Sequence, residues 1–97
     1  MTLYAIITSD IEDGLALRQA TRPEHLDYLA SLGDGLIFAG PFQTEQGSPD
    51  GSLVVVRAES LAEATGIADA DPYARIGLFR SVTIRRWKWA LNAPEDM

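Results

Sequence analysis

The chain has no cysteine and only one histidine among its 97 residues. The absence of cysteine excludes a disulfide framework, a thiolate nucleophile and a cysteine-ligated zinc site. A single histidine, without an acidic metal-binding loop pattern, leaves too few ligands for an ordinary metal site. The glycines at position 40 and between 47 and 51 also lack the spacing of a phosphate-binding loop. We therefore expect neither a metal nor a cofactor.

Basic side chains are also scarce in this sequence. Eight Lys and Arg residues stand against 14 Asp and Glu residues, which gives a formal net charge of −6. Nucleic acids and anionic membrane surfaces are bound through basic surfaces, so neither is an expected partner. The basic and aromatic segment 85–89 is interpreted instead as packing, with Trp87 and Trp89 in a core or in a dimer interface.

Long apolar runs are missing as well. No apolar stretch approaches the roughly 20 residues that a membrane span requires. Residues 1–7 are apolar, but they carry no basic segment and reach Asp10 too early for a signal peptide. Together with the lack of cysteine, these features predict a cytoplasmic protein.

What is present suffices for one domain, residues 1–97, in which residues 91–97 form a loose tail. Apolar residues make up 46% of the chain, enough for a core. Each main helix is expected to open with a capping box, one at Thr21–Glu24 and one at Ser60–Glu63. The expected elements are a strand at 3–8, a helical turn at 13–19, a helix at 21–32, a strand at 36–41, a loop at 42–51, a strand at 52–57, a helix at 60–70 and a strand at 80–89. The order βαββαβ predicts a ferredoxin-like α+β sandwich, an antiparallel sheet with two helices on one face.

The strands of this predicted sheet do not alternate between apolar and polar residues. The runs at 4–7, 36–39 and 53–56 are continuously apolar, so both faces of the sheet require burial. Two helices can cover only one face. We therefore predict a homodimer in which a second copy covers the open face of the sheet.

Two short segments carry the candidate chemistry. His25 lies one helical turn after Arg22 and at the border of the apolar stripe of its helix. Asp71 precedes Pro72 at the end of the second helix, where a negative charge is electrostatically disfavoured unless another group holds it. His25 and Asp71 are the candidate catalytic pair, and Arg22 is the candidate group for a substrate charge. The plainer interpretations are a boundary histidine bonded to backbone and an ordinary aspartate turn.

Ser52 and Tyr73 complete the set as candidate substrate-binding residues. Ser52 lacks the surrounding pattern of a nucleophile elbow, so nucleophilic catalysis is not expected, and a serine that opens a strand is usually a turn residue.

Several short motifs follow one another along nearly the whole chain. They are Arg22-Pro23-x-His25-Leu26 with Tyr28-Leu29, Ala39-Gly40-Pro41, Gly51-Ser52, Ser60-Leu61-x-Glu63-Ala64, and Ala70-Asp71-Pro72-Tyr73 followed by Gly77. In this combination the chain resembles the YCII-related (YciI-like) family of small bacterial proteins. The resemblance implies a ferredoxin-like fold, dimers in the manner of dimeric α+β barrels, and an active site of one histidine and one aspartate, here His25 and Asp71. Related dimeric α+β barrel proteins include cofactor-free isomerases, dehydrochlorinases and monooxygenases that act on small, often aromatic, compounds.

The resulting hypothesis is a cofactor-independent enzyme that moves protons on a small acidic or phenolic metabolite, as an isomerase or an eliminating lyase does. His25 is its general base and Asp71 the partner that orients it. Two other hypotheses stay open at this point. The same cleft could bind a small ligand without turnover, or the polar residues could simply tie one helix to another in a structural dimer.

Overall fold

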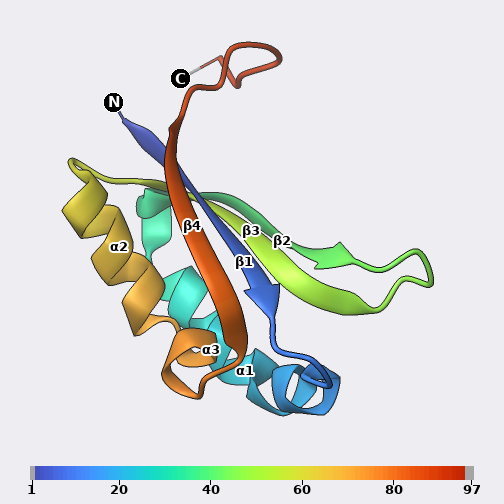
Figure 1. Cartoon of the computed structure of the whole chain (residues 1–97). Coiled ribbons are helices and arrows are strands. Elements are labelled where there is room, and N and C mark those ends of the chain that lie inside the picture. Colours follow the sequence, from blue (N-terminus) through green and yellow to red (C-terminus); the bar gives the residue numbers. More distant parts are fainter. Residues whose placement is uncertain (1, 96–97) are drawn as a thin grey trace.

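The computed structural model describes residues 2–95. Its elements in chain order are β1 (Leu3–Asp10), α1 (Leu15–Ser31), the 3-10 turn η1 (Gly33–Gly35), β2 (Leu36–Gln43), β3 (Pro49–Arg57), α2 (Leu61–Ala70), α3 (Pro72–Arg75) and β4 (Phe79–Trp87). The four strands form one sheet in the order β2-β3-β1-β4, and every neighbouring pair is antiparallel. The helices gather on one side of the sheet (Figure 1). The predicted ferredoxin-like α+β sandwich is confirmed.

The main core lies between the sheet and the helices. Strand residues Tyr4, Ile6 and Val56 pack there against Leu29 of α1 and Ala64 of α2. Along β1 and β3, alternate side chains point to this face, as the period of a strand requires. Small residues on α2 allow this helix to lie close to the sheet.

The opposite face of the sheet is partly covered by the chain itself. Phe38 of β2 and Trp87 of β4 belong to opposite edges of the sheet, yet their ring centroids are only 5.6 Å apart. Trp89, just beyond β4, lies 5.2 Å from Phe38. This aromatic cluster packs over the central strands, where Val55 is only 1% exposed. The aromatic residues therefore bury one end of the face that we expected a second copy to cover.

Helix α1 differs from the prediction at its start. It runs without interruption from Leu15 to Ser31, with Gly14 at its N-cap and Pro23 inside it. The predicted start at Thr21 is wrong, because the first turns continue directly into the second half of the helix. Pro23 cannot donate a backbone hydrogen bond, a cost of about 3 kcal/mol in a helix interior. That cost is outweighed by the contacts that both halves of α1 make with the sheet.

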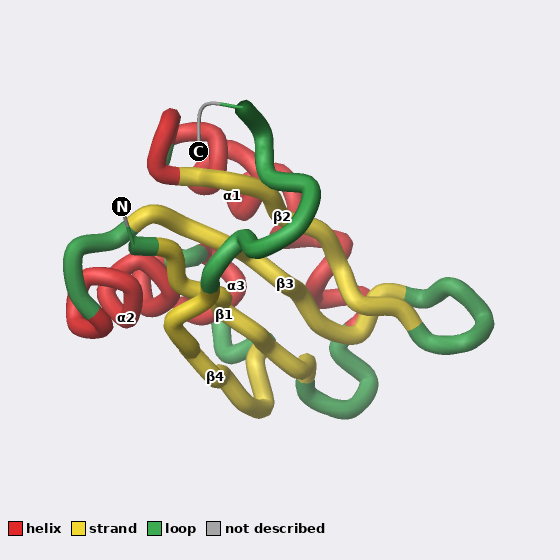
Figure 2. Tube along the Cα trace, turned by 90° about the horizontal axis from the view of Figure 1, so that it is seen from above, coloured by secondary structure: helices red, strands yellow, loops and turns green. Residues whose placement is uncertain are grey.

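The hairpin between β2 and β3 is longer than predicted. Strand β2 continues through Pro41 to Gln43, and β3 already begins at Pro49. Proline is tolerated in β2 because this is an edge strand, on which one row of N–H groups has no ladder partner. The connecting loop projects from the rest of the molecule (Figures 1 and 2). Its turn is closed by the amide of Thr44, which donates to the carbonyl of Ser48.

Strand β4 ends at Trp87, two residues before the predicted end of this strand. Residues 88–95 form neither helix nor strand, and Leu91 is 81% exposed. Residues 96 and 97 of the predicted tail lie outside the described residues. Both ends of the described chain lie toward the same end of the sheet (Figure 1). Within residues 2–95, none of the helices combines the length and the hydropathy needed to cross a bilayer.

Candidate active site

The junction between α2 and α3 fixes the position of Asp71. Helix α2 opens as predicted, with the hydroxyl of Ser60 accepting a hydrogen bond from the Glu63 amide at 3.1 Å. It ends at Asp71, whose extended backbone also starts the short helix α3. The Asp71 carboxylate accepts a hydrogen bond from the Tyr73 amide at 2.9 Å. Asp71 is thus the N-cap of α3, where a negative charge is favourable.

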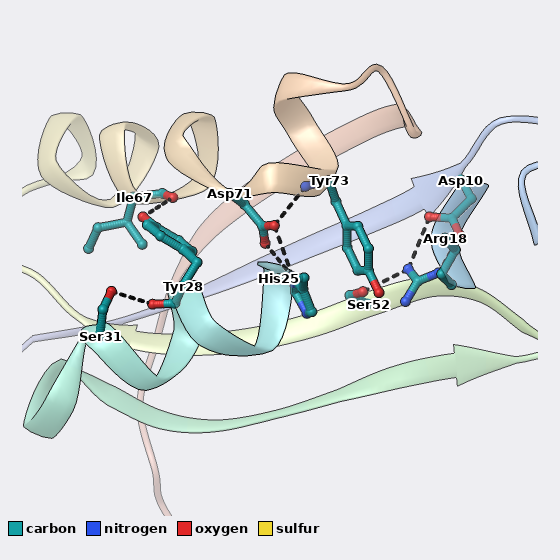
Figure 3. A network of polar contacts seen from close by, with 9 residues as sticks. All are labelled: Asp10, Arg18, His25, Tyr28, Ser31, Ser52, Ile67, Asp71 and Tyr73. Atoms are coloured by element: carbon teal, nitrogen blue, oxygen red, sulfur yellow. Dashed lines mark hydrogen bonds and ion pairs between the residues drawn. The ribbon is translucent and has the colours of Figure 1, made fainter. Parts of the chain in front are cut away.

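Asp71 and His25 lie in direct contact although they are 46 residues apart in sequence (Figure 3). The imidazole Nδ1 is 2.9 Å from Oδ1 and 2.9 Å from Oδ2 of Asp71. A carboxylate can only accept hydrogen bonds, so Nδ1 is protonated and its N–H donates a hydrogen bond to Asp71. In the neutral imidazole, Nε2 then holds the free lone pair.

Tyr73 stacks on the imidazole of His25. The two ring centroids are 3.9 Å apart and the ring planes differ by 14°. Tyr73 is 1% exposed, and burial raises the pKa of its phenol against the opposing charges of Arg18 and Arg22. The phenol therefore stays neutral at physiological pH.

A buried ion pair lies on the other side of Tyr73. The Arg18 guanidinium donates from Nε to Asp10 at 2.6 Å and from Nη2 at 3.1 Å. Nη2 also donates to the hydroxyl of Ser52 at 2.9 Å. Burial lowers the pKa of Arg18, but the hydrogen bonds and charge of Asp10 outweigh this effect and the net direction is upward. Arg18 is therefore a permanent cation held against the sheet.

A cavity of about 200 Å³ lies between α1 and the strands β2 and β3, and four residues of this network border it: His25, Tyr73, Arg18 and Ser52. Its polar lining consists chiefly of His25, Arg18, Arg22, Ser52 and Tyr73, and the rest is mainly apolar. The volume suits a small molecule about the size of a single aromatic ring.

Of the five predicted site residues, four border this cavity: His25, Arg22, Ser52 and Tyr73. Asp71 does not. It lies behind His25, beside a separate void of only about 10 Å³. The structure thus brings the predicted pair together, but only His25 of the two borders the cavity. Arg22 is exposed on α1 and reaches the cavity from its solvent side.

Two polar residues of this network, Arg18 and Asp10, were missed by the sequence analysis. The assumed break of α1 near Thr21 placed Arg18 outside the helix that carries His25. In the continuous helix, Arg18 and His25 are seven residues apart and share one face. The sequence contains a pattern that places Arg18 on the same helix face as His25, since basic side chains recur at helical spacing at Arg18, Arg22 and His25.

Within residues 2–95, no group of three or more His, Cys, Asp or Glu side chains is placed to hold a metal ion.

Comparison with known proteins identifies the family of the chain. Residues 2–88 match the YCII-related domain. The chain belongs to the YCII-related family. The protein YciI of Escherichia coli O6:H1 is 36% identical over 94 residues, which cover 89% of this chain and 96% of that protein. An uncharacterised protein of Haemophilus influenzae is 32% identical over 93 residues, covering 88% of this chain and 95% of the relative.

Solved structures agree with this assignment. The 5-chloro-2-hydroxyhydroquinone dehydrochlorinase TftG of Burkholderia phenoliruptrix AC1100, solved with 2,5-dihydroxybenzoquinone, superimposes with a TM-score of 0.81 at 30% identity. The match covers 89% of this chain and 93% of TftG. The protein Atu4242 of Agrobacterium tumefaciens shares the fold at a TM-score of 0.56 and 20% identity. The likeness confirms the predicted fold class, that of the dimeric α+β barrels.

Proposed function

We propose that this YCII-related protein is a small cytoplasmic enzyme that needs no cofactor and transfers protons on a small acidic or phenolic metabolite. His25 is the general base. In an elimination, its Nε2 takes a proton from the substrate, the electron pair of the broken bond forms a new double bond, and the leaving group departs with its own electron pair. In an isomerisation, the same proton returns to another atom of the substrate.

One observation carries this proposal. His25 is bonded through Nδ1 to Asp71 at 2.9 Å while its ring borders a cavity of about 200 Å³. Because Nδ1 is the donor, Nε2 is the nitrogen left to accept a proton from a bound molecule. A histidine with a purely structural role has no need for a ligand-sized space beside it.

The remaining cavity residues have complementary roles in this proposal. Arg22 supplies the positive charge that attracts an anionic group, because no carboxylate is bonded to it in the described part of the chain. The Ser52 oxygen accepts from Arg18, so the Ser52 hydroxyl proton is available to a ligand oxygen. Tyr73 borders the cavity and stacks on the imidazole.

The likeness to TftG supports a small-molecule enzyme. That relative is a dehydrochlorinase, and its structure holds a small quinone. Removal of HCl from a chlorinated hydroquinone is an elimination, which is one of the two reaction types proposed for His25.

The test is a panel of small phenols, chlorinated hydroquinones and carboxylic acids, followed by NMR for deuterium uptake from solvent and by halide release. We expect the protein to accelerate exchange or elimination for at least one class. His25→Gln should lower the rate by about 10²–10⁴-fold. Asp27→Asn, an exposed change on the same helix, is the control.

Equal rates for the parent protein and His25→Gln would refute the assignment of the base. Ligand-induced stabilisation without any turnover across the panel would instead favour a binding module.

We also propose that the enzyme is a homodimer formed through the open face of the sheet. Beyond the aromatic cluster, Ile7 and Leu53 are only half-buried on this face and Phe42 is 42% exposed. Leu53→Asp should convert the dimer to a monomer in light scattering coupled to gel filtration. Leu61→Asp, on α2 where Leu61 is 53% exposed, should leave the dimer intact. A monomeric parent protein would refute this proposal.

A further inference from the structure

A three-layer stack of side chains lies beside the cavity. The ring of Tyr73 has the His25 imidazole 3.9 Å from its centroid and the Arg18 guanidinium carbon 4.6 Å from the same centroid. The ring of Tyr73 lies between these two groups. Figure 3 shows the phenol in this position, with His25 on one side and Arg18 on the other.

Both outer layers come from one helix. Arg18 and His25 are seven residues apart on α1, which is two turns and about 10 Å of helical rise. Tyr73 enters between them from α3. The gap between the two side chains therefore accommodates one aromatic ring.

The outer layer formed by Arg18 is anchored to the sheet. Its guanidinium is bonded to Asp10 at the end of β1 and to Ser52 of β3. Its side chain is 6% exposed and that of Asp10 is 4% exposed. An arginine fork with two fixed partners has little freedom to move, so it holds Tyr73 against His25.

We propose that Arg18 is a positioning residue that orients the imidazole of His25 through Tyr73. Asp71 fixes the direction of the imidazole within its own plane, through the hydrogen bond at Nδ1. The stack fixes the tilt of that plane. The two restraints together leave Nε2 a single direction, which is what a general base requires. The importance of this orientation for chemistry rests on the proposed function, but the orientation itself does not.

The test uses the single histidine of the chain, which gives one set of imidazole proton resonances. They are recorded without substrate and at one pH for all variants. Stacking on Tyr73 should displace these resonances upfield, and Tyr73→Leu, which removes the ring, defines the position of an unstacked imidazole. Tyr73→Phe should keep the displacement.

Arg18 is then removed together with its partner. The double variant Asp10→Leu with Arg18→Met leaves no unpaired charge buried. Replacing a buried ion pair by apolar residues is often neutral for stability. We expect its imidazole resonances to move most of the way to the unstacked position while the core methyl resonances stay in place. Arg75→Met, an exposed arginine on the helix that carries Tyr73, is the control and should change neither.

An unchanged upfield displacement in a folded double variant would overturn the proposal. If the double variant does not fold, Arg18→Lys, which retains a charge opposite Asp10, is measured in the same way. Unfolding of both variants would make Arg18 a structural residue and would also overturn the proposal. Because no turnover is measured, failure of the proposed function leaves this result unaffected.

Discussion

Replacing Asp71 by asparagine should reverse the tautomer of His25 while the fold stays in place. Both carboxylate oxygens of Asp71 lie 2.9 Å from Nδ1 of His25, and Oδ1 also accepts the amide of Tyr73. An asparagine that keeps its oxygen on the Tyr73 amide presents its NH₂ group to Nδ1. Two donors cannot face each other, so the imidazole proton should move to Nε2.

The expected cost in stability is small. A hydrogen bond to a charged group contributes roughly 1.5–3 kcal/mol and a neutral one roughly 0.5–1.5 kcal/mol, so Asp71→Asn should destabilise the fold by about 1 kcal/mol. Asp71→Ala also removes the cap of α3, which adds about 1 kcal/mol. The loss in catalysis should be larger, since a protonated Nε2 cannot act as a base and the roughly 10²–10⁴-fold contribution of a general base disappears.

The assay is the ¹⁵N spectrum of the imidazole, in which a protonated and an unprotonated ring nitrogen have different chemical shifts. The parent protein should show Nδ1 protonated and Asp71→Asn should show Nε2 protonated, with urea unfolding measured in parallel. Asp69→Asn, the same exchange at an exposed position two residues earlier, should change neither. Proton location at Nε2 in the parent protein, or an unchanged tautomer in a folded Asp71→Asn variant, would refute the reasoning.

Three further predictions concern stability. Tyr28 donates to the carbonyl of Ile67 at 2.7 Å, and burial, followed by the charge of Asp71, raises the pKa of its phenol. The contribution of this phenol to the free energy of unfolding is therefore fully present below the pKa of an unfolded tyrosine, about 10, and is lost as the pH rises through the higher folded value. Tyr28→Phe should reduce this loss of stability in urea unfolding at alkaline pH. An unchanged dependence of stability on pH would contradict the prediction. Gly51→Ala should destabilise the fold by about 1–3 kcal/mol, because the added Cβ would overlap the carbonyl of Thr8. Gly66→Ala on α2, where the space around the added Cβ is open, should stabilise the fold by up to about 1 kcal/mol. A higher unfolding temperature for Gly51→Ala than for Gly66→Ala would contradict this. Thr8→Val should stabilise by about 1 kcal/mol in urea unfolding, since the buried Thr8 hydroxyl has no partner in the described chain, and destabilisation would show that the hydroxyl is satisfied.

Much of the fold could be predicted from local pattern, because capping and periodicity act over short distances. The capping box at Ser60 forms as expected. The corresponding motif at Thr21 does not form, although its sequence pattern is the same. The difference lies outside the motif, since Ala16, Leu17 and Ala20 are good helix formers and the turn before Thr21 is tied to the sheet through Arg18. Such a tertiary contact overrides a local signal and cannot be seen in a window of four residues.

The position of Asp71 was partly predictable. An aspartate at the end of α2 is unfavourable by its charge, which indicates that another group holds it. The structure provides two such groups, the amide of Tyr73 and the imidazole of His25. The first follows from the local sequence, because aspartate is a preferred N-cap and Pro72 is suited to the first position of a helix. The second depends on how α1 and α2 pack on the same face of the sheet, which motif spacing alone does not give.

The continuity of α1 connects these observations. Pro23 weakens the middle of the helix, and a break there would separate Arg18 from the face that carries His25. The helix stays continuous because Arg18 holds its first half to β1 and β3 and Leu29 holds its second half in the core. The same arginine that keeps the helix continuous also packs on Tyr73, which in turn stacks on the imidazole. Arg18, which the sequence analysis missed, is thus the residue through which the folding of α1 and the geometry of the site are coupled.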